Sequence, residues 1–225
     1  MSESTQPEKV TVDQSGRTLG PRALGTRQRL LDATVELLGE QSVRDIAVVD
    51  IARRAGTSPA TFYQYFKDVG DLTLTLAESA AAEMPGVLEL IEGSWQGEKG
   101  LDTARALVDA FVRHWDAHRA VLLVRNLAAD EGDRSFQKVR REALRPVLDH
   151  LAGRIEESQR AGRVESELHP YAASAALASI LERLAAYHRE LEPLGVTREH
   201  LVETCARIVL QTVMGRAGQA AGEGS

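Results

Sequence analysis

The stretch IAVVDIARRAGTSPATFYQYFKDVGDL, residues 46–72, decides the fold. Its first part has the spacing of one buried helix face, carried by Val48, Ile51, Ala52 and Ala55. Gly56 follows, and glycine readily enters the left-handed conformation that ends a helix. Ser58 can cap a second helix that begins at Pro59, where the missing N–H costs nothing. The stretch therefore predicts two short helices joined by a tight turn, a helix-turn-helix.

The second of these helices, residues 59–66, has an outward face of unusual composition. Phe62 and Phe66 lie four residues apart and are expected to be buried. At about 100° per residue, the side chains that point outward are Ala60, Thr61 and Gln64, with Tyr63 and Tyr65 beside them. A short helix that presents small, hydroxyl, amide and phenol groups is suited to binding another molecule.

The segment IARRAGTSPATFYQYF, residues 51–66, resembles the DNA-binding domain of the TetR (tetracycline-repressor-like) family of transcriptional regulators. The family pattern is Ile-Ala, then Ala-Gly-Val-Ser, then a Leu/Phe-Tyr-x-His/Tyr-Phe ending. The resemblance implies an all-α chain with an N-terminal three-helix helix-turn-helix head and a C-terminal helical bundle for ligand binding and dimerisation. It also implies a DNA-binding repressor, not an enzyme, that a small-molecule effector releases from a palindromic double-stranded operator.

Site residues follow from the outward face and the resemblance together. Base contacts are expected from Ala60, Thr61 and Gln64, with apolar contact from Pro59, because these side chains can match base edges and the thymine methyl group. Phosphate contacts, which fix register without reading sequence, are expected from Ser58, Tyr63, Tyr65, Lys67 and the Arg27 and Arg29 pair of the first helix. For the two tyrosines, half-buried packing is the alternative.

Two positions depart from the family pattern. Ala47 stands where the family often has Thr or Ser at the start of the second helix, so a hydroxyl cap is missing and Asp45 is expected to cap instead. Val69 stands where the family commonly has Lys. Both changes remove usual phosphate contacts, which places more weight on the arginines that precede the helix-turn-helix.

The net charge of −6 does not exclude a nucleic-acid partner. Residues 1–70 hold nine basic and nine acidic residues, whereas residues 71–225 hold eighteen basic and twenty-four acidic ones. The acidic excess therefore belongs to the C-terminal part, and local patches govern phosphate binding. Cys205 is the single cysteine, so no internal disulfide can form, and no apolar run is long enough to span a membrane. A cytoplasmic protein is expected.

The chain divides into four parts. Residues 1–20 are polar and are expected to be a disordered arm with a basic end, and residues 216–225 a loose tail. Residues 21–70 form the predicted head, whose first helix begins at about Thr26. Residues 71–215 form the predicted effector-binding and dimerisation domain. Its first helix is expected to be capped by Asp68 or Asp71 and to end at Pro85. The further expected helices are 87–95, 101–119, 120–129, 134–161, 169–191 and 197–214, and the last two are expected to pair with their copies in a homodimer.

Aromatic and apolar side chains in the body are candidates for an effector pocket. We single out Phe111, Trp115, Leu122, Arg125 and Leu181, although each residue type is found more often in plain core or surface. His114 and His118 have the i, i+4 spacing of zinc ligands, but no third ligand falls on their helix face, so we predict neither a metal site nor a cofactor. The rival hypothesis is an all-helical enzyme or an effector-binding module that acts on a small apolar molecule.

Overall fold

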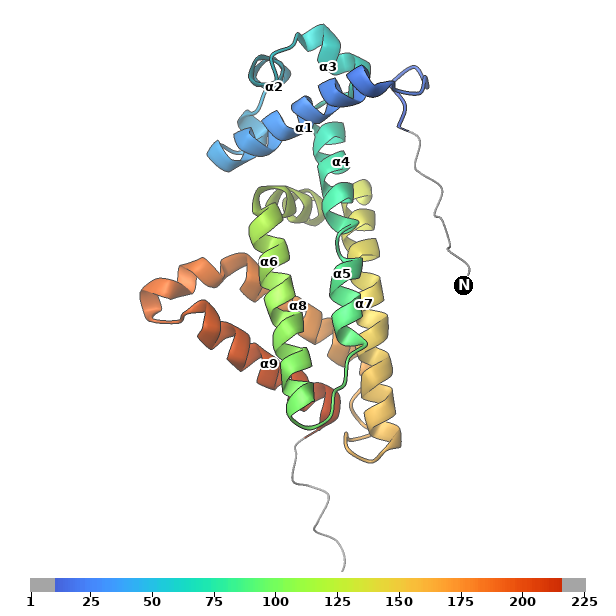
Figure 1. The fold of residues 1–225 in the computed structure, drawn as a ribbon, viewed down its shortest axis with the longest axis vertical. Helices are drawn as coiled ribbons and strands as arrows, with labels where there is room; N and C mark the ends of the chain where they lie inside the picture. The colour runs from blue at the N-terminus through green and yellow to red at the C-terminus, as the bar shows by residue number, and fades with distance from the viewer. Residues whose placement is uncertain (1–10, 216–225) are drawn as a thin grey trace, which may run out of the picture.

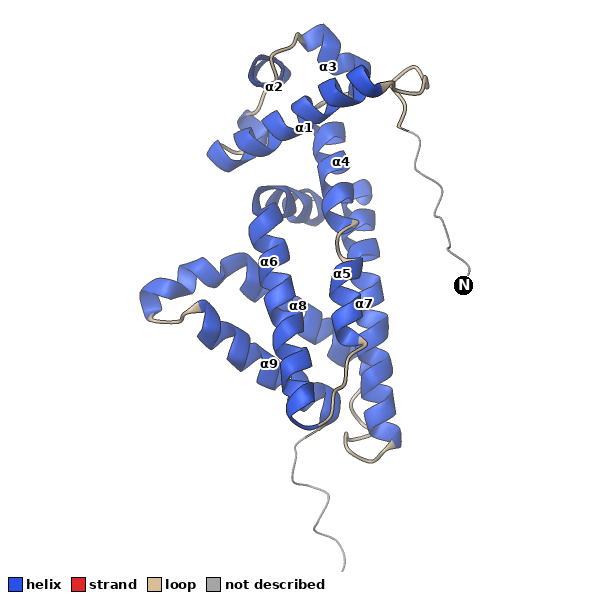
Figure 2. Cartoon of the chain, viewed as in Figure 1, coloured by secondary structure: helices blue, strands red, loops and turns tan. Residues whose placement is uncertain are grey.

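The protein is built from helices joined by short loops (Figures 1 and 2). The computed structural model describes residues 11–215, apart from three side chains in α5. Within that range the helices are α1 (Pro21–Glu40), η1 (Val43–Asp45), α2 (Val48–Arg54), α3 (Pro59–Tyr65), α4 (Val69–Ala81), α5 (Pro85–Ile91), α6 (Gly97–Asp130), α7 (Arg134–Arg160), α8 (Pro170–Leu191), η2 (Glu192–Leu194) and α9 (Arg198–Met214). The expectation of an all-α chain is confirmed.

The head consists of α1, α2 and α3 around one apolar cluster. Its fully buried members are Leu30, Ile51, Phe62, Phe66 and Leu72. Burying a side chain of this size stabilises a fold by about 1.5–3 kcal/mol, so these residues make a large favourable contribution to the folding of the head. The predicted turn is confirmed: Gly56 has φ +64°, and the Ser58 hydroxyl accepts a hydrogen bond from the Thr61 N–H at 3.2 Å.

Helix α4 joins the head to the body (Figure 1). The Asp68 carboxylate caps it by accepting from the Asp71 N–H at 2.8 Å. One turn further, Leu72 is buried in the head cluster, whereas Ala77 and Ala80 pack in clusters of the body. A boundary at residue 70 therefore falls at the start of a helix that both parts share, and a tilt of α4 moves the head.

The body packs α5 to α9 around a second, larger core. Helix α6 runs through it, and α7, α8 and α9 contribute Val147, Leu177 and Val209. Expected helices over 101–119 and 120–129 are one helix, α6, with a break from helical dihedrals at His118 (φ −121°, ψ 17°). The junction predicted between residues 119 and 120 is thus a kink within one helix, at His118.

Three expectations about the N-terminal part are wrong. Helix α1 begins at Pro21, not Thr26. Residues 11–20 are not a disordered arm: Val12 and Thr18 form a bridge, and Leu19 is buried. Asp45 does not cap α2, because it lies in the separate turn η1 and no side chain caps at Ala47. The remaining predicted disorder, at residues 1–10 and 216–225, lies outside the described residues.

Candidate nucleic-acid interface

In the part of the chain that the structure describes, the outer face of α3 is largely exposed and has the predicted composition. Ser58, Pro59, Ala60 and Gln64 are exposed, and Tyr63 is 54% exposed. Thr61 is half-buried, and its hydroxyl lies 3.0 Å from that of Ser58. Because Phe62 beneath them is fully buried, the face is rigidly mounted on the head core. It presents donors, acceptors and small apolar groups side by side, which is the chemistry of base-edge recognition.

The two tyrosines of α3 differ. The Tyr63 ring meets Phe62 edge-on, with centroids 5.5 Å apart, while most of its surface stays exposed. Tyr65 is half-buried against the head cluster. The alternative of half-buried packing therefore describes Tyr65, and Tyr63 and the exposed Lys67 are the better placed groups for phosphates.

Arg27 is occupied within the head. Its guanidinium lies over the Phe66 ring, 5.0 Å from the centroid. Burial lowers the pKa of Arg27, and the carboxylates of Asp71 and Glu78 partly offset that effect. A stacked guanidinium of this kind stabilises the local packing, so a phosphate contact by Arg27 competes with an existing intramolecular one.

Other head arginines are paired as well. Arg54 of α2 donates to Glu36 at 3.1 Å and to Glu40 at 2.9 Å, which fastens α2 to α1. Arg53 pairs with Asp50. The exposed Arg29 donates to the Ala55 carbonyl at 3.4 Å, beside the helix-turn-helix turn.

The sequence does not predict the turn formed by residues 11–20, which packs on the end of α3. The Gln14 N–H donates to the Gln64 carbonyl at 3.0 Å, and its side-chain amide donates to the Tyr65 carbonyl at 3.2 Å. Arg17 is held at this turn by Asp13, 3.4 Å away. These contacts satisfy carbonyls at the C-terminal end of α3 that the helix itself leaves unpaired, so the turn holds that end of α3 in place.

The five predicted ligand residues of the body are core in this conformation. Phe111, Trp115, Leu122, Arg125 and Leu181 are each at most 3% exposed. The Arg125 guanidinium donates to Glu182 at 2.7 Å and to the Asn126 side chain at 3.0 Å. Burial lowers the pKa of Arg125, and Glu182 opposes that effect. Ligand binding by these residues stays a prediction.

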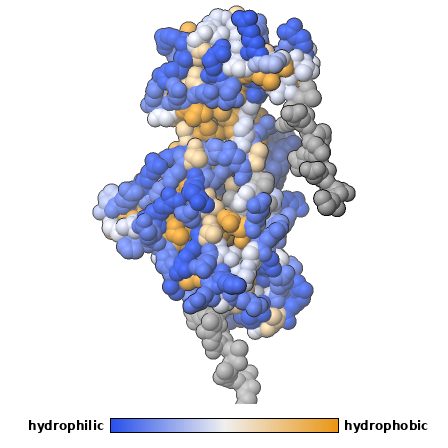
Figure 3. Space-filling view, viewed as in Figure 1, coloured by the Kyte–Doolittle hydropathy of each residue, from blue (hydrophilic) through white to orange (hydrophobic). Residues whose placement is uncertain are grey.

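A cavity of about 570 Å³ lies where head and body meet, and we call it the waist cavity. Its walls come from α1, α4 and α6, and Figure 3 shows an apolar patch between the two parts. The lining residues are Val35, Leu38, Gly39, Leu76, Ser79, Ala80, Asp116, Ala117, His118, Arg119, Ala120, Val121 and Leu123. The volume is within the range of small-molecule sites.

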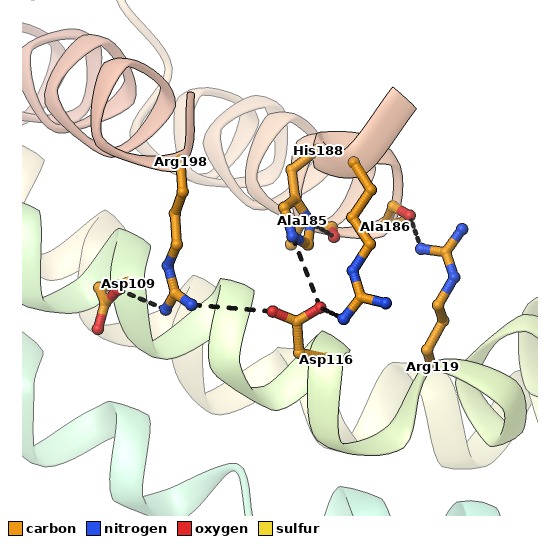
Figure 4. A network of polar contacts seen from close by, with 8 residues as sticks. Asp109, Asp116, Arg119, Ala185, Ala186, His188 and Arg198 are labelled. Carbon is orange, nitrogen blue, oxygen red and sulfur yellow. Dashed lines mark hydrogen bonds and ion pairs between the residues drawn. The ribbon is translucent and has the colours of Figure 1, made fainter. Parts of the chain in front are cut away.

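Helix α6 is also fastened to α8 and α9 by charged contacts (Figure 4). Asp116 accepts from Arg189 at 2.7 Å and lies 3.5 Å from the buried His188. Arg198, the first residue of α9, donates to Asp109 at 2.6 Å. The middle of α6 thus lines the waist cavity and is joined to the last two long helices, and Asp116 takes part in both.

Two family models match the chain. The model described as bacterial regulatory proteins, tetR family, matches residues 30–73, and the tetracyclin repressor-like C-terminal domain matches residues 88–220. The chain belongs to the TetR family.

Several relatives of this TetR-family chain have been described. The HTH-type transcriptional regulator YvdT of Bacillus subtilis is 26% identical over 101 residues, which is 44% of this chain and 50% of YvdT. The match thus spans about half the length of that relative. The FadR regulator of Bacillus subtilis, solved with stearoyl-CoA, is 18% identical with a TM-score of 0.60 over 84% of this chain and 98% of FadR. SmeT, the repressor of a multidrug efflux pump in Stenotrophomonas maltophilia, is 17% identical with a TM-score of 0.58 over 86% of this chain and 94% of SmeT.

Proposed function

We propose that this TetR-family chain is a repressor that binds a palindromic DNA operator as a homodimer and leaves it when a small molecule binds. The observation that carries the proposal is the exposed face of α3, with Ala60, Tyr63 and Gln64 presented over a buried Phe62. On this proposal, Gln64 and Thr61 meet base edges, and Tyr63, Ser58 and Lys67 meet phosphates. The similar SmeT is a repressor, which supports that mode of regulation. The proposed place of action is the cytoplasm.

Helices α8 and α9 are the proposed dimer contact. Both carry exposed apolar residues, Ile180 on α8 at 37% and Ile208 on α9 at 40% exposed. On α8, the neighbouring exposed positions Ala172, Ala176 and Ser179 are small, so a second helix can approach its backbone closely. A two-fold dimer would present its two α3 helices to major-groove segments about one helical turn, roughly 34–36 Å, apart.

The waist cavity is the proposed effector site. It is lined by α1 of the head, by the linking helix α4 and by α6 of the body, so its occupant contacts both parts at once. An effector acts only if its affinity differs between the two arrangements of head and body. The stearoyl-CoA complex of the similar FadR supports an effector with a large apolar part.

The test is selection of bound sequences from random double-stranded DNA by the full-length protein. We expect enrichment of an inverted repeat. The exposed Tyr63→Asp substitution should abolish selection, because it places a carboxylate where phosphate is expected. Leu168→Asp, on the loop before α8, is the matched control and should select the same repeat. Enrichment without two-fold symmetry, or equal selection by Tyr63→Asp, would refute the proposal.

A further inference from the structure

Three metal-ligating side chains meet beside the waist cavity. Glu83 follows α4 in the turn that leads to α5, and His114 and His118 lie one turn apart on α6. One ligand atom of each lies within 4.8 Å of the other two. The His118 Nε2 is 2.8 Å from the Glu83 carboxylate, and the two imidazole centroids are 5.0 Å apart. The sequence alone offered only the two histidines.

His114 is the unusual member of this group. Its Nε2 is buried and finds no hydrogen-bond partner in the described part of the chain. A buried polar atom without a partner costs about 1–3 kcal/mol. A neutral imidazole carries a lone pair on one of its two ring nitrogens, so this unpartnered nitrogen can act as a ligand atom.

Two imidazoles and one carboxylate suit a divalent transition metal better than a hard cation. Imidazole favours zinc and its neighbours in the first transition row, whereas magnesium and calcium prefer oxygen ligands. A tetrahedral ion with bonds of about 2.0–2.2 Å holds its ligand atoms about 3.4 Å apart. The three side chains need only small rotations to reach that spacing, and one coordination position stays open for water or for a donor atom of an effector.

The position of the group gives metal binding a structural consequence. Glu83 sits just beyond the C-terminal end of α4, the helix that carries the head. His118 is the residue at which α6 departs from helical geometry, and it also lines the waist cavity. An ion held by all three would fasten the end of α4 to the kink of α6.

We propose that Glu83, His114 and His118 bind a divalent transition-metal ion of the zinc class, and that the bound ion changes DNA affinity by fixing α4 against α6. The regulatory part rests on the proposed DNA-binding function, whereas ion binding does not.

Ion binding is tested first, without DNA, by titrating the full-length protein with Co²⁺ and following its visible absorption, with Zn²⁺ as competitor. We expect one ion per chain, displaced by Zn²⁺ and not by Mg²⁺. His118→Gln and Glu83→Gln should each weaken Co²⁺ binding at least about 10- to 100-fold. Loss of a side chain that only hydrogen-bonds a metal ligand already lowers metal affinity by that much. Because Glu83 is exposed, its substitution leaves folding intact should a histidine variant misfold.

The control is His150→Gln, which removes an exposed histidine paired with Glu92 at 3.6 Å, outside the group of three. It should bind Co²⁺ as the unchanged protein does. No Co²⁺ spectrum, or a spectrum that survives Glu83→Gln and His118→Gln unchanged, would overturn the site.

Affinity for selected DNA is then measured with Zn²⁺ and with chelator. The regulatory part is supported if DNA affinity differs at least about fivefold between the two conditions, which is the lower range of allosteric coupling, and if Glu83→Gln abolishes that difference. Equal affinities refute it. Failure to bind any DNA, both with Zn²⁺ and with chelator, would instead refute the proposed function.

Discussion

The buried ion pair between Arg125 and Glu182 provides a quantitative test of how the body is held together. Their side chains are 3% and 18% exposed, and the guanidinium donates to the carboxylate at 2.7 Å. The substitution Glu182→Gln keeps the shape but leaves the Arg125 charge without its counter-ion. Removing one partner of a buried pair costs about 3–5 kcal/mol. Because some water reaches Glu182, we expect about 3 kcal/mol. For a protein of this size, that lowers Tm by roughly 6–12 °C.

The assay is thermal and urea unfolding followed by circular dichroism, at equal protomer concentration because oligomerisation shifts apparent stability. Glu203→Gln is the control: it removes the carboxylate that pairs with Arg105, 2.7 Å away, and with Arg207, and because these side chains are 37–60% exposed, the loss should be less than about 1 kcal/mol. The double substitution Arg125→Met with Glu182→Leu should recover most of the loss, since apolar replacements of buried pairs are often neutral. A loss below about 1 kcal/mol for Glu182→Gln, equal to the control, would contradict the claim that this charge is buried and compensated.

Three further predictions concern the head and the dimer. Ser58→Ala removes the cap that accepts from the Thr61 N–H, and it should cost about 1 kcal/mol in urea unfolding; no loss would contradict the capping role. Arg27→Ala removes the guanidinium stacked on Phe66, and should lower stability by about 0.5–1 kcal/mol while leaving the salt dependence of DNA binding unchanged. If the slope of log DNA affinity against log salt concentration instead falls in magnitude by about 1, Arg27 is a phosphate contact. Ile208→Asp should convert the proposed dimer to monomer in analytical ultracentrifugation, and a dimer that the substitution leaves unchanged would contradict the proposed place of α9 in the interface.

Local signals predicted the helix-turn-helix well because its residues act through near neighbours. Ser58 caps the helix that starts at the next residue, and Gly56 closes the turn in which it stands. The start of α1 was missed for a related reason. Its first two turns are largely exposed, with Leu24 at the surface, so no apolar periodicity marks them. The stronger sign was Pro21, which is suited to the first position of a helix.

Contacts between distant parts of the chain were not predictable in the same way. Residues 11–20 look disordered by composition, yet Gln14 is held by carbonyls about fifty residues away. Arg125 is a candidate pocket residue by sequence, because nothing in the local sequence identifies Glu182 as its partner. Glu83 joins the histidines of α6 only through the way in which the end of α4 lies against that helix.

The claim that the outer face of α3 reads DNA is central, and it is tested most directly by comparing two of its substitutions on the selected operator and on every single-base variant of it. Gln64→Ala should lose preference at one base position of each half-site, by about 1–3 kcal/mol. Lys67→Ala should weaken binding to all sequences alike and reduce the salt slope by about 1. The opposite outcome, in which Gln64→Ala weakens every sequence equally and no base preference changes, would contradict the account.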